Sequence, residues 1–194
     1  MENRLNENKK EFLLLCEDIK RPGISELLKW LETSDFFTAP ASTKYHGSYE
    51  GGLCEHSLNV AKTLRLLCGD SDIQNVPLET IYITALFHDL CKVNFYKKSK
   101  RNVKTDAGWV EKDYWEVEEK FPCGEHADKS IILLQQYIKL LPEEIMAIRA
   151  HMGGFDTSVK GGSFMIGKIF EKSNLAVLLH CADLMATYIC ERKE

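Results

Sequence analysis

The chain has 194 residues, which is enough for one domain with a well-buried core. Its composition, with 44% hydrophobic and 28% charged residues, is ordinary for a globular protein and excludes a disordered or fibrous chain. The net charge of −4 excludes a global basic field of the kind that attracts nucleic acid or an anionic membrane.

The first half of the chain has the periodicity of amphipathic helices, with apolar residues recurring at three- and four-residue spacing. The pattern predicts helices over 11–21, 24–37, 54–68 and 78–92. Pro22 and Gly23 separate the first two predicted helices. Pro77 stands at the expected first turn of the helix over 78–92. Residues 38–53 contain proline, glycines and clustered polar side chains, which indicates a loop.

The second half begins with a change of character. Residues 102–118 mix Val, Trp and Tyr with charges around the turn signal Asp106-Ala107-Gly108, a pattern that favours a two-stranded hairpin. Helical spacing then returns over 126–141, 142–152 and 173–193. The glycine-rich segment 152–164 interrupts the last two helices. The predicted fold class is therefore all-α, a helical bundle with a small β-hairpin insertion around residues 102–118.

Two acidic residues stand in segments whose composition predicts burial. The run from Ile81 to Cys91 is apolar around the whole helix, yet it contains His88 and Asp89. Asp183 repeats this feature in LAVLLHCADLMA. A buried carboxylate takes up a proton, pairs with a cation or binds a metal, because an unpaired buried charge is costly. Two such residues in two buried helices indicate a shared cation.

Histidines extend this pattern along the chain. A single buried histidine or aspartate is most often a hydrogen-bonded core residue. The hypothesis of a metal site therefore depends on the recurrence of such residues along the chain. In chain order the candidates are His56, His88, Asp89, His126, His151 and Asp183. Imidazoles with carboxylates and no thiolate suit Mn, Fe, Ni, Co or Zn. Spacings of about thirty residues fit one ligand group on each helix, with the groups converging at the centre of a bundle.

This order and its local contexts resemble the HD-domain superfamily of metal-dependent phosphohydrolases. FFTAPASTKYHGSYEGGLCEHSLNVA followed by ALFHDLCKVNFY is similar to the C-terminal HD domain of bacterial 3′→5′ exoribonucleases, and the chain also resembles stand-alone HD hydrolases of bacteria and their phages. The resemblance covers residues 35–190. It implies a single HD domain over 1–194, with the helices of 1–34 packed against it.

The resemblance also implies roles for the six residues. His56, His88, Asp89 and Asp183 surround a first divalent ion, and Asp89 bridges to a second ion held by His126 and His151. The metal is Mn, Fe, Ni, Co, Mg or Zn. The implied reaction is attack of a metal-bound hydroxide on phosphorus, in a nucleotide or a short or cyclic oligonucleotide. Asp89 and Lys92 are then the catalytic residues, and whether the substrate is a monoester or a diester stays open.

Several basic and aromatic residues are candidates for substrate contacts. Lys92 lies four residues after His88, hence on the same face of the predicted helix, and in the family this lysine resembles a phosphate contact. The loop KYHGSYEGG offers Lys44, His46 and Tyr49, and Lys160 is a further candidate. For the loop, a wall without ligand contacts is nearly as plausible. The basic run Lys97–Lys104 is interpreted as a solvated hairpin rather than a nucleic-acid surface.

Two other functions use the same residues. Some HD-fold proteins hold two irons with this ligand set and activate oxygen, and Lys92 favours hydrolysis over that reaction. A non-catalytic module that binds a nucleotide through its metal is the third reading, and the intact ligand set disfavours it. His180 is interpreted as either a partner of a metal ligand or a core histidine.

Cysteine content and the N-terminus predict the cellular location. The seven cysteines are odd in number and contain no CxxC pair, which favours free thiols in a reducing cytosol. The N-terminus is polar, and no apolar run approaches the roughly 20 residues of a membrane span. We therefore expect a cytoplasmic protein without a membrane partner, and the sequence does not predict its oligomeric state.

Overall fold

The computed structural model describes residues 2–69, 76–106 and 108–192, and within these ranges the chain is mostly helical. The helices are α1 (Glu2–Cys16), α2 (Ile24–Thr33), α3 (Gly52–Gly69), α4 (Leu78–Phe87), α5 (His126–Leu134), α6 (Pro142–Ala150), α7 (Thr157–Lys160), α8 (Met165–Phe170) and α9 (Asn174–Met185). Short helical turns are η1 (Leu90–Lys92), η2 (Gly153–Phe155) and the π-helix η3 (Ala186–Cys190). Among the described helices, none has both the length and the apolar character needed to cross a bilayer.

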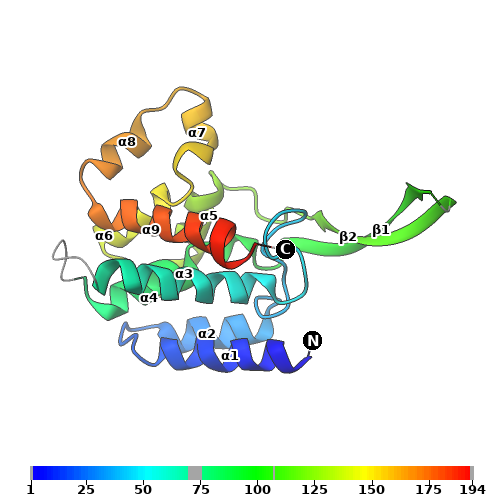
Figure 1. Ribbon diagram of the computed structural model, residues 1–194. Helices are drawn as coiled ribbons and strands as arrows, with labels where there is room; N and C mark the ends of the chain where they lie inside the picture. Colours follow the sequence, from blue (N-terminus) through cyan, green and yellow to red (C-terminus); the bar gives the residue numbers. More distant parts are fainter. Residues whose placement is uncertain (1, 70–75, 107, 193–194) are drawn as a thin grey trace.

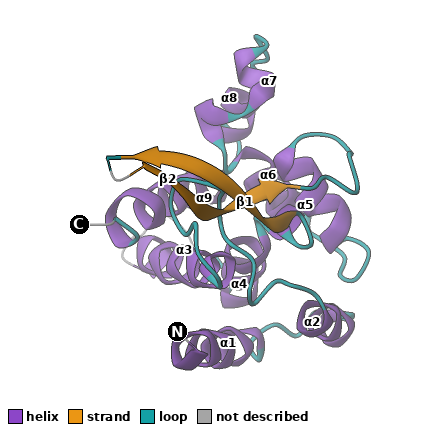
Figure 2. Ribbon diagram, turned by 90° about the vertical axis from the view of Figure 1, so that its right-hand side faces the viewer, coloured by secondary structure: helices purple, strands orange, loops and turns teal. Residues whose placement is uncertain are grey.

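The helices form layers around α3 and α4. Figures 1 and 2 show α1 and α2 together on one side of these helices, and α7 and α8 at the opposite extremity. The ring of Phe12 in α1 lies 4.9 Å from that of Phe36 and 5.8 Å from that of Phe87 at the end of α4. On the other side α3 contacts α9, which in turn contacts α6. The apolar core therefore surrounds α3 and α4, and both helices bury most of their residues.

A long antiparallel hairpin projects from one side of the bundle (Figure 1). Its strands are β1 (Tyr96–Thr105) and β2 (Gly108–Val117), with Tyr96 opposite Val117 at the base. The first strand begins earlier than the predicted boundary at 102. Its early residues are polar and show no apolar alternation. Cross-strand ion pairs such as Lys97–Glu116 and Lys100–Glu111 connect them to the second strand. This pairing neutralises part of the basic run 97–104.

Most predicted helices differ from the structure in their ends. The helix expected over 11–21 spans Glu2–Cys16, the one over 24–37 ends at Thr33, and the one over 173–193 ends at Met185 and continues as η3, with Lys193 outside the described residues. The helix expected over 78–92 ends at Phe87 and continues as the 3₁₀ turn η1. The helix expected over 126–141 ends at Leu134, and Tyr137 beyond it stacks on Trp30. The segment 152–164 contains η2 and α7, whose first turn is capped by the Asp156 side chain. These departures arise from contacts between distant segments and from capping, which periodicity does not register.

Candidate metal centre

The six predicted metal ligands come from five helices and lie together in the structure. His56 lies inside α3, His88 and Asp89 directly follow α4, His126 begins α5, His151 directly follows α6, and Asp183 lies in α9. His56, His88, Asp89 and His151 are at most 3% exposed. The bundle therefore brings residues that are more than a hundred positions apart in the sequence into one buried cluster.

Asp89 is the centre of this cluster. Its Oδ2 atom lies 3.4 Å from His88 Nε2 and 3.7 Å from His56 Nε2. Its Oδ1 atom lies 2.6 Å from His126 Nε2 and 3.7 Å from His151 Nε2. The two oxygens of one carboxylate thus face two different pairs of imidazoles, which is the arrangement required of a carboxylate that bridges two cations.

Asp183 completes the half of the cluster that contains His56. Its Oδ1 atom lies 3.1 Å from His56 Nε2. One ligand atom each from His56, His88 and Asp183 lie within 4.8 Å of one another, and so do ligand atoms from His88, Asp89 and His151. Each group is compact enough for a single ion to contact its members. Imidazole nitrogens and carboxylate oxygens are the donors that divalent transition metals use.

The ring orientations of His88 and His151 fit this role. In each case the Nδ1–H donates to the backbone carbonyl three residues earlier, Ala85 at 2.8 Å and Ile148 at 2.7 Å. These carbonyls belong to the last helical turn, and the Ile148 carbonyl also accepts the backbone N–H of His151 at 3.4 Å. Nε2 is therefore the ring nitrogen left for another partner, and both Nε2 atoms are buried without a hydrogen-bond partner. A buried polar nitrogen without a partner is costly, and a bound cation would supply one.

The carboxylates make the site attractive to positive charge. Burial lowers the pKa of His56, but contacts with Asp183 and Glu191 outweigh burial and raise that pKa to about 10. Burial also lowers the pKa of His126, and the nearby Cys91 and Asp89 raise it to about 10. A divalent cation would replace these protons, since it satisfies the same negative oxygens.

His151 and the two aspartates have the protonation states that metal ligands need. Burial, together with the charge of His88, lowers the pKa of His151 to about 3, so its ring is neutral. Burial would raise the pKa of Asp89, but Lys92 and His88 hold it well below its usual value. His56 likewise outweighs burial at Asp183 and lowers its pKa. Both carboxylates are therefore ionised.

Lys92 lies at the site, but not through the geometry that the sequence suggested. The prediction of a helical face shared with His88 was wrong, because the α-helix ends before His88. In the 3₁₀ turn that follows, residues three apart are aligned. The Lys92 ammonium donates to Asp89 Oδ2 at 2.6 Å, and it lines the cavity described below.

A cavity of about 890 Å³ opens above the cluster, with Asp89, His126, His151 and Asp183 among its lining residues. Of the predicted substrate contacts, Lys44, His46, Lys92 and Lys160 also line it. Burial and the nearby charges of His56 and Lys92 lower the pKa of His46 to about 4, so its ring is neutral. Tyr49 is outside the lining, and its hydroxyl donates to Glu55 at 3.0 Å. The exposed rings of Tyr45, Phe155 and Tyr188 add aromatic surface to the cavity.

His180 supports the segment that carries His151. Its Nδ1–H donates to the His151 carbonyl at 2.6 Å, and its ring stacks on Phe170. Gly153 has a φ of +51°, and a Cβ there would lie only 2.3 Å from the His180 ring. His180 and Gly153 therefore fix the path of the chain just after His151.

Two residues in contact with the histidines were not singled out from the sequence. Cys91 is buried, its Sγ lies 3.2 Å from His126 Nδ1, and with Asp89 and His126 it forms a further group of ligand atoms within 4.8 Å of one another. Glu191 lies with its Oε1 3.0 Å from His56 Nδ1. A thiol two residues after a predicted ligand gave a weak signal for the first. Nothing local in the charged segment ERK distinguished the second.

Four imidazoles and two carboxylates converge in a helical bundle as a cluster that could hold metal ions. A family model described as HD domain matches residues 53–187, which contain all six of these residues. The chain belongs to this family, whose members bind divalent metals and form a superfamily of metal-dependent phosphohydrolases. No curated protein and no solved structure matches the chain.

Proposed function

We propose that the protein is a phosphohydrolase that holds two divalent cations and cleaves the phosphoester bond of a nucleotide or of a short or cyclic oligonucleotide. The observation that carries this proposal is the position of Asp89, whose two oxygens face separate histidine pairs at the base of a cavity. The first cation would be held by His56, His88, Asp89 and Asp183. The second would be held by Asp89, His126 and His151.

The lining residues suit a phosphorylated substrate. When bound, divalent cations neutralise phosphate charge and lower the pKa of the attacking water. Lys92 places its ammonium beside Asp89, where it can donate to a phosphate oxygen. Lys44 and Lys160 add positive charge to the same cavity. The chain therefore offers basic groups for the phosphate, and with water as the nucleophile no serine or cysteine nucleophile is needed.

The cavity supports a substrate larger than inorganic phosphate. Its volume lies in the range of roughly 300–1,000 Å³ that is typical of ligand pockets. Aromatic side chains such as Tyr45 and Tyr188 can stack on a base. The likeness of the local motifs to the HD domain of 3′→5′ exoribonucleases supports a short oligonucleotide within this class. We propose Mn, Fe, Ni, Co, Mg or Zn as the cation.

Two alternatives share the ligand set. A diiron oxygenase would use the same histidines and aspartates, but it has no need of the ammonium of Lys92 or of the basic groups around the cavity. A non-catalytic nucleotide-binding module would keep the cavity and lose turnover. Oxygen consumption by an iron-containing protein that releases no phosphate with any divalent metal would favour the first alternative.

The proposal predicts separate effects for Asp89 and Lys92. Asp89→Ala should lose both bound cations and all turnover, because it removes an oxygen from each cation site. Lys92→Met should keep the cations and lower turnover by about tenfold to a hundredfold, the loss expected for one hydrogen bond from a charged group. Asp113→Ala, on the exposed hairpin, is the control for a lost aspartate.

The measurements are elemental analysis and a screen of phosphomonoesters and phosphodiesters with Mn, Mg, Ni, Co, Fe and Zn. Wild-type turnover in a folded Asp89→Ala variant would rule out the proposed mechanism. Metal content close to two ions per chain, with turnover of a phosphoester, would support it.

A further inference from the structure

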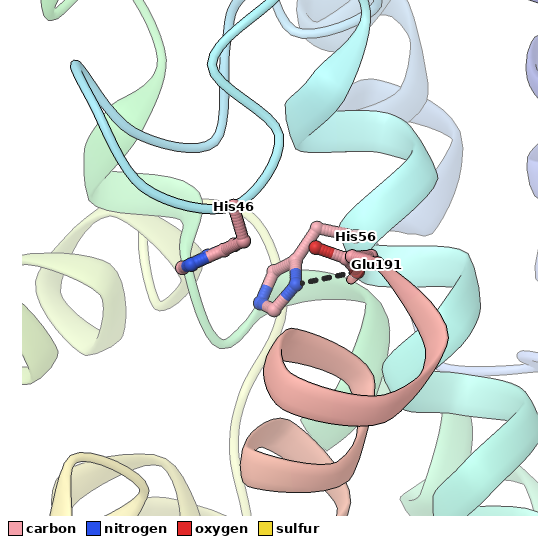
Figure 3. A group of neighbouring side chains, drawn as sticks. All are labelled: His46, His56 and Glu191. Carbon is pink, nitrogen blue, oxygen red and sulfur yellow. Dashed lines mark hydrogen bonds and ion pairs between the residues drawn. The ribbon is translucent and has the colours of Figure 1, made fainter. Parts of the chain in front are cut away.

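His56 differs from the other clustered histidines in what holds its Nδ1 atom. His88 and His151 use a carbonyl of their own helix end, and His126 contacts the Cys91 thiol. The His56 Nδ1–H instead donates to the Glu191 carboxylate at 3.0 Å (Figure 3). This partner lies 135 residues away in the chain and outside the residues matched by the family model.

His56 also differs from His88 and His151 in its position along its helix. His56 lies inside α3, where backbone carbonyls already accept hydrogen bonds from the N–H four residues later. His88 and His151 lie at helix ends, where carbonyls are available. For the buried imidazole of His56, the Nδ1 acceptor comes from another element, and Glu191 supplies it.

The π-helix brings Glu191 to this place. Glu191 follows Asp183 by eight residues, which in a regular α-helix would turn it about 80° away from the face of Asp183. The π-helix η3 widens the turn, with the Glu191 N–H bonded to the Ala186 carbonyl at 3.0 Å. The two carboxylates consequently contact opposite nitrogens of one ring, Asp183 at Nε2 and Glu191 at Nδ1.

The surroundings of Glu191 hold its carboxylate firmly. The side chain is 2% exposed, and Asn59 donates to the same Oε1 atom at 3.0 Å. Asn59 lies one turn after His56 on α3, so both donors to Glu191 come from one face of that helix. Both hydrogen bonds reach Oε1, while Oε2 is buried without a hydrogen-bond partner, so α3 orients the carboxylate and the His56 ring through this one oxygen.

We propose that Glu191 is a positioning residue that holds the Nδ1–H of His56 and so directs the Nε2 lone pair at the cation between Asp89 and Asp183. The inference rests on the proposed metal site, but not on the identity of the substrate. A carboxylate acceptor also makes the ring a stronger donor to a metal, and loss of such partners costs about 10–100-fold in metal affinity. Glu191 would therefore tune one cation site and leave the other unchanged.

The test is a titration of metal-free protein with Zn²⁺ or Mn²⁺ in competition with a chromophoric chelator. Glu191→Ala should weaken one of the two cation sites by about 10–100-fold and leave the second unchanged. Glu191→Gln should weaken it less, because the amide oxygen still accepts the Nδ1–H. The matched control is Glu55→Ala. Glu55 precedes His56 in α3, and its carboxylate contacts Arg4 and Tyr49 rather than the His56 ring.

A second measurement reports on the ring itself. In the Zn²⁺-loaded protein labelled with ¹⁵N-histidine, the His56 Nδ1–H signal should be sharp in wild type, shifted in Glu191→Gln and lost to solvent exchange in Glu191→Ala. Wild-type affinity at both sites in both variants would overturn the role of Glu191. Equal weakening of both sites with a lowered melting temperature would also overturn it, because that result indicates a general structural role.

The experiment separates this inference from the proposed reaction. Titration needs no substrate, so a wild-type protein that binds cations but hydrolyses no phosphoester would contradict the reaction and leave the Glu191 result interpretable. A wild-type protein that binds no divalent cation would overturn both.

Discussion

Substitution of Asp89 by asparagine should destabilise the metal-free protein through Lys92. The two charged groups lie 2.6 Å apart, and their side chains are 4% and 11% exposed. Asn keeps the shape of Asp but removes the charge, so the ammonium stays buried without an anionic partner. Breaking a buried pair in this way costs about 3–5 kcal/mol. This is a large part of the roughly 5–15 kcal/mol that stabilises a typical domain.

Urea unfolding in the presence of a chelator measures this loss. With an m-value of about 1–3 kcal/mol/M, the unfolding midpoint of Asp89→Asn should fall by about 1 M or more. In the Lys92→Met background the same substitution should cost less, with a coupling free energy of up to about 3 kcal/mol. The exposed Asp113→Asn should change stability by less than about 0.5 kcal/mol.

Additivity would refute this reasoning. If Asp89→Asn costs the same free energy with Lys92 and with Met at that position, the ammonium does not depend on Asp89. The stability of the site would then come from the imidazoles around Asp89 alone. Strong coupling would instead show that one carboxylate balances the lysine as well as the histidines.

Two further predictions concern ion pairs outside the metal site. Glu144 is fully buried and accepts two hydrogen bonds from Arg21, so Glu144→Ala should lower the free energy of unfolding by about 3–5 kcal/mol. The adjacent, exposed Glu143→Ala is the control, and similar losses for both would contradict the argument. Burial raises the pKa of Asp156, but Arg149 outweighs burial and lowers it below the usual 3.8. The stabilising contribution of Asp156 should be complete above pH 3.8 and lost as the pH falls through the folded-state pKa, so urea midpoints of wild type and Asp156→Asn should converge only in strong acid.

Two of the six candidate metal ligands could be singled out because they contradict their own surroundings, and the others through their recurrence along the chain. Asp89 and Asp183 are charged residues in apolar segments, and such a contradiction is visible in the sequence alone. The segments around them are apolar over the length of a helix, and Pro77 stands at the first turn of one of them, so these helices were predictable as well. The mostly helical fold with a hairpin follows from the same local patterns.

The ends of the helices were less predictable, and they determine the chemistry. The apolar run through Cys91 gave no sign that the helix stops at Phe87, because a 3₁₀ turn and an α-helix share the same composition. That change placed Lys92 against Asp89 rather than along the face of His88. Periodicity identifies which residues are buried, but the exact turn decides which atoms meet.

The partners of the imidazoles show where sequence reasoning can be extended. A histidine at a helix end can use a carbonyl of its own last turn, as His88 and His151 do, so its orientation is a local property. His56 lies inside α3 and uses an acceptor from a distant segment instead. Nothing in the local sequence of His56 indicates that partner, and the π-turn after Asp183 brings Glu191 to it. For these three histidines, the orienting partner is therefore local where the residue ends a helix and distant where the residue lies inside one.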